Sequence, residues 1–161
     1  MARVSEAPLP ETALLQTYHQ RPGCYADCYA VELPGKVSFA DYVVAFYTTP
    51  LFKLERVILR VTVRRPSTDG EVRALAEGRA ERFAAWDVEG REVDQLLLCD
   101  MAAKTRSWLM VEPTPGGTRL YFGSAVVPGG NGKLGVLVHA LMGFHKAYSR
   151  ALLGAAVRRL R

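Results

Sequence analysis

Residues 96–127 read LLLCDMAAKTRSWLMVEPTPGGTRLYFGSAVV, and this stretch decides the predicted fold. Apolar and polar side chains alternate along it, which is typical of β-strands with one buried face. Two segments interrupt the alternation, the short Ala102-Ala103 link and PTPGG, and both are typical of hairpin turns. Together with an earlier segment, the pattern predicts an antiparallel meander of four strands: Arg82 to Val88, Val93 to Met101, Lys104 to Glu112 and Thr118 to Val127.

A hairpin fixes which residues lie opposite each other, and therefore which side chains share a face of the sheet. The pairs that we use are Val88 with Arg91, Met101 with Lys104, and Glu112 with Gly117. In this register one face is mainly apolar, and we expect it to pack against the last helix of the chain. Its members are Phe83, Ala85, Leu96, Leu98, Leu109, Val111, Leu120, Phe122 and Val126, with Asp94, Asp100, Thr105, Ser107 and Ser124 among them.

The opposite face of the predicted sheet mixes large apolar side chains with charged ones, and two interpretations of it stay open. In the first, this face meets solvent and its aromatic rings are half covered by the stems of neighbouring arginines. In the second, the apolar residues form one patch that packs against a second copy of the chain, which predicts a homodimer through the sheet. The predicted interface residues are Trp86, Leu97, Trp108, Met110 and Tyr121.

Helical spacing of apolar residues appears on both sides of the meander. Ser38 stands at an N-cap position before FADYVVAFY, residues 39–47, and a second helical stripe follows over residues 51–61. A short third helix is expected over residues 67–75, where Ser, Thr and Asp are available as caps. From residue 133 onward the chain has apolar residues at helical spacing and no proline, so we predict one long closing helix.

The segment CYADCYAVEL, residues 24–33, predicts the first strand of the main domain. The side of this strand that carries Tyr25, Asp27 and Tyr29 is expected to face the core. Cys24 and Cys28 would lie about 13 Å apart at ~3.3 Å per residue, which is too far for a disulfide. We expect residues 1–22 to form an N-terminal arm and residues 23–161 to form a single domain.

Length, composition and charge limit the class of protein. The chain has 161 residues, of which 49% are hydrophobic and 23% charged, and its net charge is +5. These values are typical of one soluble domain, and no uncharged run is long enough to span a membrane. The basic residues are scattered instead of clustered among aromatic ones, so we expect no nucleic-acid partner. The N-terminus has no apolar stretch of signal-peptide length, which predicts a cytoplasmic protein.

Three motifs carry a resemblance to a known superfamily: YADCYAVELP, LLLCDMAAKTRSWLMVEP and MGFHKAYSRALLGAAVRRL. With them the chain resembles the START-like superfamily, also called SRPBCC or polyketide cyclase/lipid-transport proteins, over roughly Tyr25 to Leu160. It looks most like a bacterial family of that superfamily described only as a domain of unknown function. The resemblance implies an α+β helix-grip fold, in which a curved antiparallel sheet wraps the long C-terminal helix, with two or three short helices after the first strand. It also implies a ligand cavity between sheet and helix.

The candidate chemistry centres on His145. His145 and Tyr148 share one face of the predicted last helix, because they lie three residues apart. The catalytic candidates are His145 and Asp100. In the sharper of two interpretations, Asp100, Ser107 and His145 converge in one cavity. In the plainer interpretation, Asp100 is a turn residue. The predicted ligand-binding residues are Ser107, Phe122, Leu141, His145 and Tyr148. We expect no metal and no cofactor, because no histidine has a second ligand at metal-binding spacing on its own element.

Three functions follow from these observations. The first is a binding protein for a small apolar or lipid-like ligand in a cavity between sheet and C-terminal helix. The second is an enzyme on the same scaffold, a cyclase or hydrolase that uses His145. The third is a protein interaction module that uses the outer sheet face and has a filled core. Fold alone does not separate them.

Overall fold

The computed structural model describes residues 2–53, 67–129 and 136–161, and the side chains of α5 only from residue 144 onward. The predicted helical stripe over residues 51–61 lies mostly outside the described residues, and so does the side chain of Leu141. The elements appear in the order β1 (Ser5–Glu6), α1 (Gln16–His19), β2 (Tyr25–Pro34), α2 (Phe39–Tyr47), α4 (Asp69–Ala76), β3 (Arg82–Phe83), β4 (Trp86–Arg91), β5 (Gln95–Asp100), β6 (Thr105–Thr114), β7 (Gly117–Val126) and α5 (Val136–Leu160).

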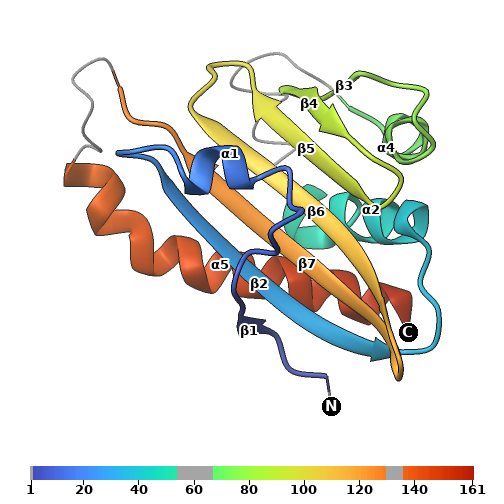
Figure 1. Ribbon diagram of the computed structural model, residues 1–161. Helices are drawn as coiled ribbons and strands as arrows, with labels where there is room; N and C mark the ends of the chain where they lie inside the picture. The colour runs from blue at the N-terminus through green and yellow to red at the C-terminus, as the bar shows by residue number, and fades with distance from the viewer. Residues whose placement is uncertain (1, 54–66, 130–135) are drawn as a thin grey trace.

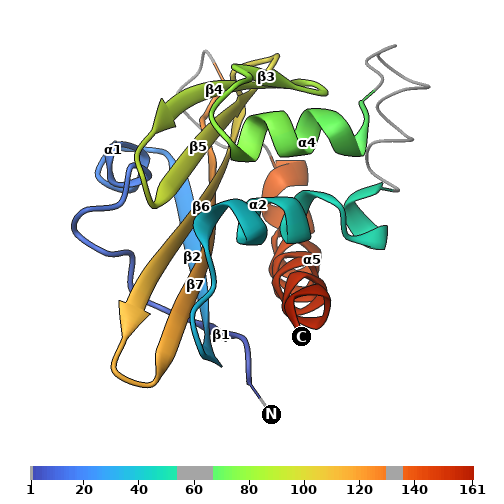
Figure 2. The ribbon, with the colours of Figure 1, turned by 90° about the vertical axis from the view of Figure 1, so that its right-hand side faces the viewer.

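The described strands form one antiparallel seven-stranded sheet in the order β1-β2-β7-β6-β5-β4-β3. The fold is therefore α+β, as expected, with the long helix α5 at the C-terminal end of the chain. Figure 2 shows α2, α4 and α5 on one side of the sheet and α1 on the other. We call the side that meets α5 the inner face and the side that meets α1 the outer face.

The short helices begin where the sequence predicts. Ser38 caps α2, since its side chain accepts a hydrogen bond from the backbone N–H of Asp41. Thr68 and Glu71 form a capping box at the start of α4. Two tyrosines of α2 then tie the helix to the inner face: the Tyr42 hydroxyl donates to the backbone carbonyl of Tyr121 at 2.9 Å, and the Tyr47 hydroxyl lies 3.0 Å from Ser107 Oγ.

The faces of β5, β6 and β7 agree with the prediction. Met101 and Lys104 flank the β5–β6 turn as expected, because Cys99 pairs with Arg106. Glu112 pairs with Arg119 instead of Gly117, a shift of two residues. An even shift leaves every side chain on its predicted face, because side chains alternate with a period of two.

The prediction for the first strand of the meander is wrong. The chain turns at Ala84, which has φ 52°, and residues 82 and 83 form the separate strand β3. Glu89-Gly90 is not a hairpin but a bulge inside β4, and Trp86 pairs with Asp100. This register differs from the predicted one by an odd number of residues, so Trp86 lies on the inner face, against the main core.

The outer face is covered by the chain's own residues 5–19, which contain β1 and α1 (Figure 1). We call residues 5–19 the N-terminal segment. Leu15 is fully buried there and lies against Gly123, where an added Cβ atom would come within 2.7 Å of Leu15 and 2.9 Å of the Trp108 ring. The cluster under this segment includes Leu97, Trp108, Met110 and Tyr121, each no more than 5% exposed. The predicted interface is thus corrected: four of its residues are buried within the chain, and Trp86 belongs to the other face.

Two polar residues of the outer face hold the N-terminal segment in place. The side chain of Gln95 accepts hydrogen bonds from the Leu14 N–H at 2.8 Å and from the Trp108 indole N–H at 3.0 Å, and donates to the Thr12 carbonyl at 3.0 Å. Arg106 donates through Nε to the Tyr18 hydroxyl at 2.9 Å and forms an ion pair with Glu89 at 3.1 Å. In the part of the chain that the structure describes, the buried polar side chains under this segment are therefore paired.

Candidate functional site

A cavity of about 210 Å³ lies between the inner face of the sheet and α5. Strands β4, β6 and β7 line it from one side, and α5, Phe46 of α2 and Phe52 line it from the other. Among the described residues its lining consists of Phe46, Phe52, Trp86, Thr105, Arg106, Ser107, Phe122, Ser124, Ala125, Val126, His145, Tyr148, Ser149 and Leu152. Four of the five predicted ligand-binding residues, Ser107, Phe122, His145 and Tyr148, are brought together here.

Aromatic rings make up much of the cavity wall. The rings of Phe46 and Phe122 lie 4.8 Å apart, and Phe46 also contacts Phe52 at 6.4 Å between centroids. Trp86 and Tyr148 contribute further rings from β4 and α5. A wall of this kind favours a flat apolar molecule, because aromatic rings pack well edge-to-face or offset against one another.

One end of the cavity is polar: Ser124 and His145 line it there, and both contact Asp27, a residue that the sequence analysis did not list as a site residue. Asp27 Oδ1 accepts hydrogen bonds from the backbone N–H of Ser124 at 3.1 Å and from its hydroxyl at 2.7 Å. Asp27 Oδ2 accepts from the Tyr25 hydroxyl at 3.0 Å and lies 3.3 Å from His145 Nε2. His145 Nε2 is also 2.7 Å from Ser124 Oγ. We call Tyr25, Asp27, Ser124 and His145 the Asp27 cluster.

These contacts keep the Asp27 carboxylate ionised. Burial alone would raise the pKa of Asp27, but hydrogen bonds from His145 and Ser124 outweigh burial, so the pKa is lowered from its ordinary value. The pKa of the Tyr25 phenol is raised, first by burial and then by the negative charge of Asp27, and Tyr25 therefore stays protonated as a donor. The Tyr25 hydroxyl and the two Ser124 donors thus hydrogen-bond to the carboxylate, and the His145 ring lies beside it.

The Asp27 cluster contains a serine, a histidine and an aspartate, yet its connections differ from those of a nucleophilic triad. In a triad one imidazole nitrogen binds the aspartate and the other takes the proton of the serine. Here the same nitrogen, Nε2, faces both residues, and the hydroxyl proton of Ser124 is directed to Asp27. Ser124 Oγ is then an acceptor for His145, so the geometry holds the histidine ring and does not activate the serine.

Asp100 does not join Ser107 and His145, which corrects the sharper interpretation of the sequence. Its carboxylate accepts hydrogen bonds from the backbone N–H groups of Lys104 at 2.7 Å and Thr105 at 3.2 Å. It therefore caps the β5–β6 turn, as in the plainer interpretation. Ser107 lines the cavity independently of Asp100. Its hydroxyl is hydrogen-bonded to the hydroxyl of Tyr47.

Two further residues of the cavity wall carry polar atoms that are buried and unpaired. The indole N–H of Trp86 and the hydroxyl of Ser149 have no hydrogen-bond partner in the described part of the chain. Both residues line the cavity, and Ser149 is only 1% exposed. Buried polar groups are nearly always paired in folded proteins, with the chain, with water or with a ligand.

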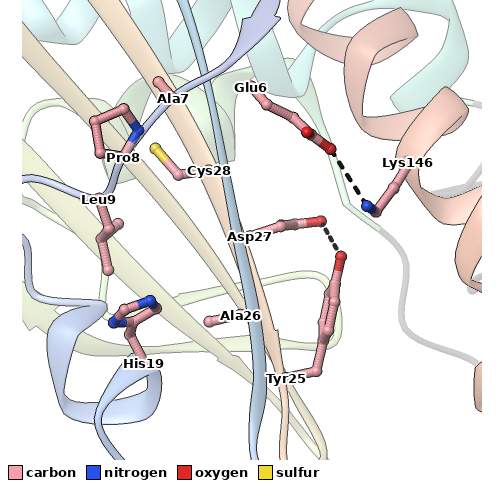
Figure 3. Close-up of a pocket in the computed structure, with 10 residues that line it drawn as sticks. All are labelled: Glu6, Ala7, Pro8, Leu9, His19, Tyr25, Ala26, Asp27, Cys28 and Lys146. Atoms are coloured by element: carbon pink, nitrogen blue, oxygen red, sulfur yellow. Dashed lines mark hydrogen bonds and ion pairs between the residues drawn. The ribbon is translucent and has the colours of Figure 1, made fainter.

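A second hollow, of about 270 Å³, straddles the edge of β2 next to the Asp27 cluster (Figure 3). Asp27 and Tyr25 lie on the side of β2 that faces α5, whereas Ala26 and Cys28 lie on the side of the N-terminal segment. An exposed ion pair between Glu6 and Lys146, at 3.3 Å, borders it. Asp27 thus lines this edge hollow while its partner His145 lines the cavity.

Asp27, Trp86 and Ser149 differ in how clearly the sequence marks them as site residues. Asp27 stands on the core side of the strand predicted for residues 24–33. Because a buried carboxylate is costly unless it is paired, the alternation of side chains along this strand already indicated that Asp27 needs a partner. The partner could not be read from the sequence, because β2 pairs with β7, which lies far along the chain. Trp86 was placed on the wrong face by the incorrect hairpin, and Ser149 carried no signal.

Two other kinds of site are absent from the described residues. No group of three or more His, Cys, Asp or Glu side chains there could hold a metal ion. None of the described helices combines the length and apolar character needed to cross a membrane. Comparisons of the chain with protein-family models, curated proteins and solved structures find no match.

Proposed function

We propose that this protein binds a small, mainly apolar molecule in the cavity between the inner face and α5. The observation that carries the proposal is an aromatic cavity of about 210 Å³ with two buried, unpaired polar atoms in its wall. Ligand sites are typically apolar hollows with a few polar groups that set orientation. In this proposal the sheet and α5 form the helix-grip arrangement that the sequence resemblance implies.

The cavity volume limits the ligand to about one ring. A dry cavity of ~150 Å³ accepts benzene, and drug-sized ligands occupy sites of ~300 Å³ or more. The cavity of about 210 Å³ lies between these values. A single substituted ring fits this volume, and a long-chain lipid does not, so the lipid-like ligand of the sequence analysis narrows to a small aromatic or a short acyl group.

Acid–base catalysis at His145 is a second candidate function, and the carboxylate of Asp27 beside the ring is the observation that favours it. If Nε2 of the neutral ring donates to Ser124, the other nitrogen is an acceptor that can take a proton. We rank this function below ligand binding, because the cluster connects its hydroxyl to Asp27 and leaves no activated nucleophile.

The test combines native mass spectrometry of freshly purified protein with ligand-observed NMR, using acetophenone as the probe. We expect saturable binding of one molecule per chain. The variant Ser149→Leu fills the cavity from α5 and is expected to weaken binding at least tenfold while the protein stays folded. Absence of saturable binding at millimolar probe, or unchanged binding in Ser149→Leu, would reject the cavity as the binding site.

A hydrolysis assay separates the two candidate functions. We expect the wild-type protein and His145→Gln to cleave p-nitrophenyl acetate at the same rate. A rate in the wild type at least tenfold above that of His145→Gln would instead favour the enzyme.

A further inference from the structure

The two tryptophans of the chain differ in the state of their indole N–H groups. Trp108, under the N-terminal segment, donates to Gln95 Oε1 at 3.0 Å. Trp86, in the cavity wall, has an N–H that is shielded from solvent and has no partner in the described part of the chain. In the described part of the chain, one indole therefore has an acceptor and the other has none.

The chemistry of the unpaired groups specifies what is missing. An indole N–H can only donate a hydrogen bond, so the missing partner of Trp86 must be an acceptor. The hydroxyl of Ser149, on α5, is unpaired as well and can donate to an acceptor by rotation about one bond. Both residues line the same cavity, and the surrounding wall includes the rings of Phe46 and Phe122.

We propose that the ligand of this cavity is a single-ring aromatic molecule that carries an acceptor oxygen, and that this oxygen receives the hydrogen bonds of Trp86 and Ser149. The inference rests on the proposed function and deepens it, because it names the class of ligand. The aromatic wall selects the ring, the volume limits it to one ring, and the unpaired donors select the oxygen. A ligand without an acceptor would bury the indole N–H of Trp86 and the hydroxyl of Ser149 without providing them a hydrogen-bond partner.

The test compares two probes of nearly the same shape, acetophenone and α-methylstyrene, in which a CH₂ group replaces the carbonyl oxygen. Their different solubilities in water affect binding to every variant equally, so the informative quantity is the ratio of their dissociation constants. We measure this ratio by ligand-observed NMR for the wild type, Trp86→Phe and Ser149→Ala. Trp108→Phe is the matched control, because its indole N–H is already paired on the outer face.

We expect Trp86→Phe to shift the ratio against acetophenone by roughly fivefold to tenfold, the effect of one hydrogen bond, and Ser149→Ala to shift it by a smaller factor in the same direction. Trp108→Phe should leave the ratio unchanged. If both probes bind and the ratio is the same in all variants, the acceptor is not recognised and this inference is wrong, although the cavity still binds ligands. If neither probe binds the wild type, the proposed function fails and the inference fails with it. Should Trp86→Phe not fold, the Ser149→Ala ratio decides the outcome.

Discussion

The two faces of the sheet are covered in different ways. On the outer face, residues of the N-terminal segment pack against Leu97, Trp108 and Tyr121, and Gln95 pairs the polar groups that this packing buries. On the inner face, α2 and α5 cover the sheet but leave a cavity whose wall contains unpaired polar atoms. Among the described residues, the buried polar side chains of the outer face are paired within the chain, whereas the wall of the inner cavity has unmet hydrogen-bonding capacity.

This difference separates residues that stabilise the fold from residues that are available for binding. A polar side chain such as Gln95 contributes to stability because each of its atoms has a partner. An atom without a partner among the described residues, such as Trp86 Nε1, carries a desolvation cost that a water or a ligand can relieve. The same residue type, tryptophan, therefore has different roles on the two faces, and the predictions below test that contrast.

The largest expected effect comes from Gln95→Leu on the outer face. The substitution removes the partner of the buried Trp108 N–H and also the partners of the part-buried Leu14 N–H and Thr12 carbonyl. An unpaired buried group costs about 1–3 kcal/mol and a part-buried one less, so we expect a loss of about 3 kcal/mol in the free energy of unfolding, measured by urea denaturation.

Thr12→Ala is the matched control for Gln95→Leu. It keeps the backbone carbonyl that Gln95 binds and removes only an exposed side chain, so its effect should stay within about 0.5 kcal/mol. A loss for Gln95→Leu no larger than that of the control would show that the N-terminal segment is not held as described.

The pair Trp108→Phe and Trp86→Phe makes the same chemical change on opposite faces. Trp108→Phe removes a paired donor from a fully buried site, and we expect a loss of about 2 kcal/mol. Trp86→Phe removes an unpaired donor next to a cavity, so we expect a change of less than about 1 kcal/mol. Equal losses in urea denaturation would contradict the contrast between the two faces.

The smallest expected effect is the contribution of Asp27 to stability in acid. The pKa of Asp27 is lower in the folded protein than its ordinary value of 3.8, so its contribution is present above about pH 4 and is lost as the pH falls through the folded pKa. Asp27→Asn has no such titration, and its stability should fall less steeply than that of the wild type below pH 4. Thermal unfolding of both proteins between pH 6 and pH 2.5 measures the difference, and identical slopes would mean that the Asp27 cluster does not form.

Sequence reasoning located four residues of the cavity lining from two local rules. Helical spacing placed His145 and Tyr148 on one side of α5, and strand alternation placed Ser107 and Phe122 on the inner face. The second rule tolerated an error of two residues in the β6–β7 pairing, because an even shift preserves the faces. It failed at Trp86, because a turn at Ala84 and a bulge near Gly90 change the register by an odd number of residues. The Glu89-Gly90 pair at the bulge is equally typical of a hairpin turn, so the residue types did not separate the two.

The sequence by itself determined the α+β class, the start of α2 and α4, the inner faces of β5 to β7 and the long closing helix. These features depend on neighbouring residues, through caps and through periods of two and 3.6 residues. Only the tertiary structure decided that β2 lies beside β7, which assembles the Asp27 cluster, and that the N-terminal segment covers the outer face. Both outcomes join residues about a hundred positions apart. The choice among such contacts depends on the fit between surfaces and on the pairing of buried polar groups, and no local sequence pattern specifies either of them.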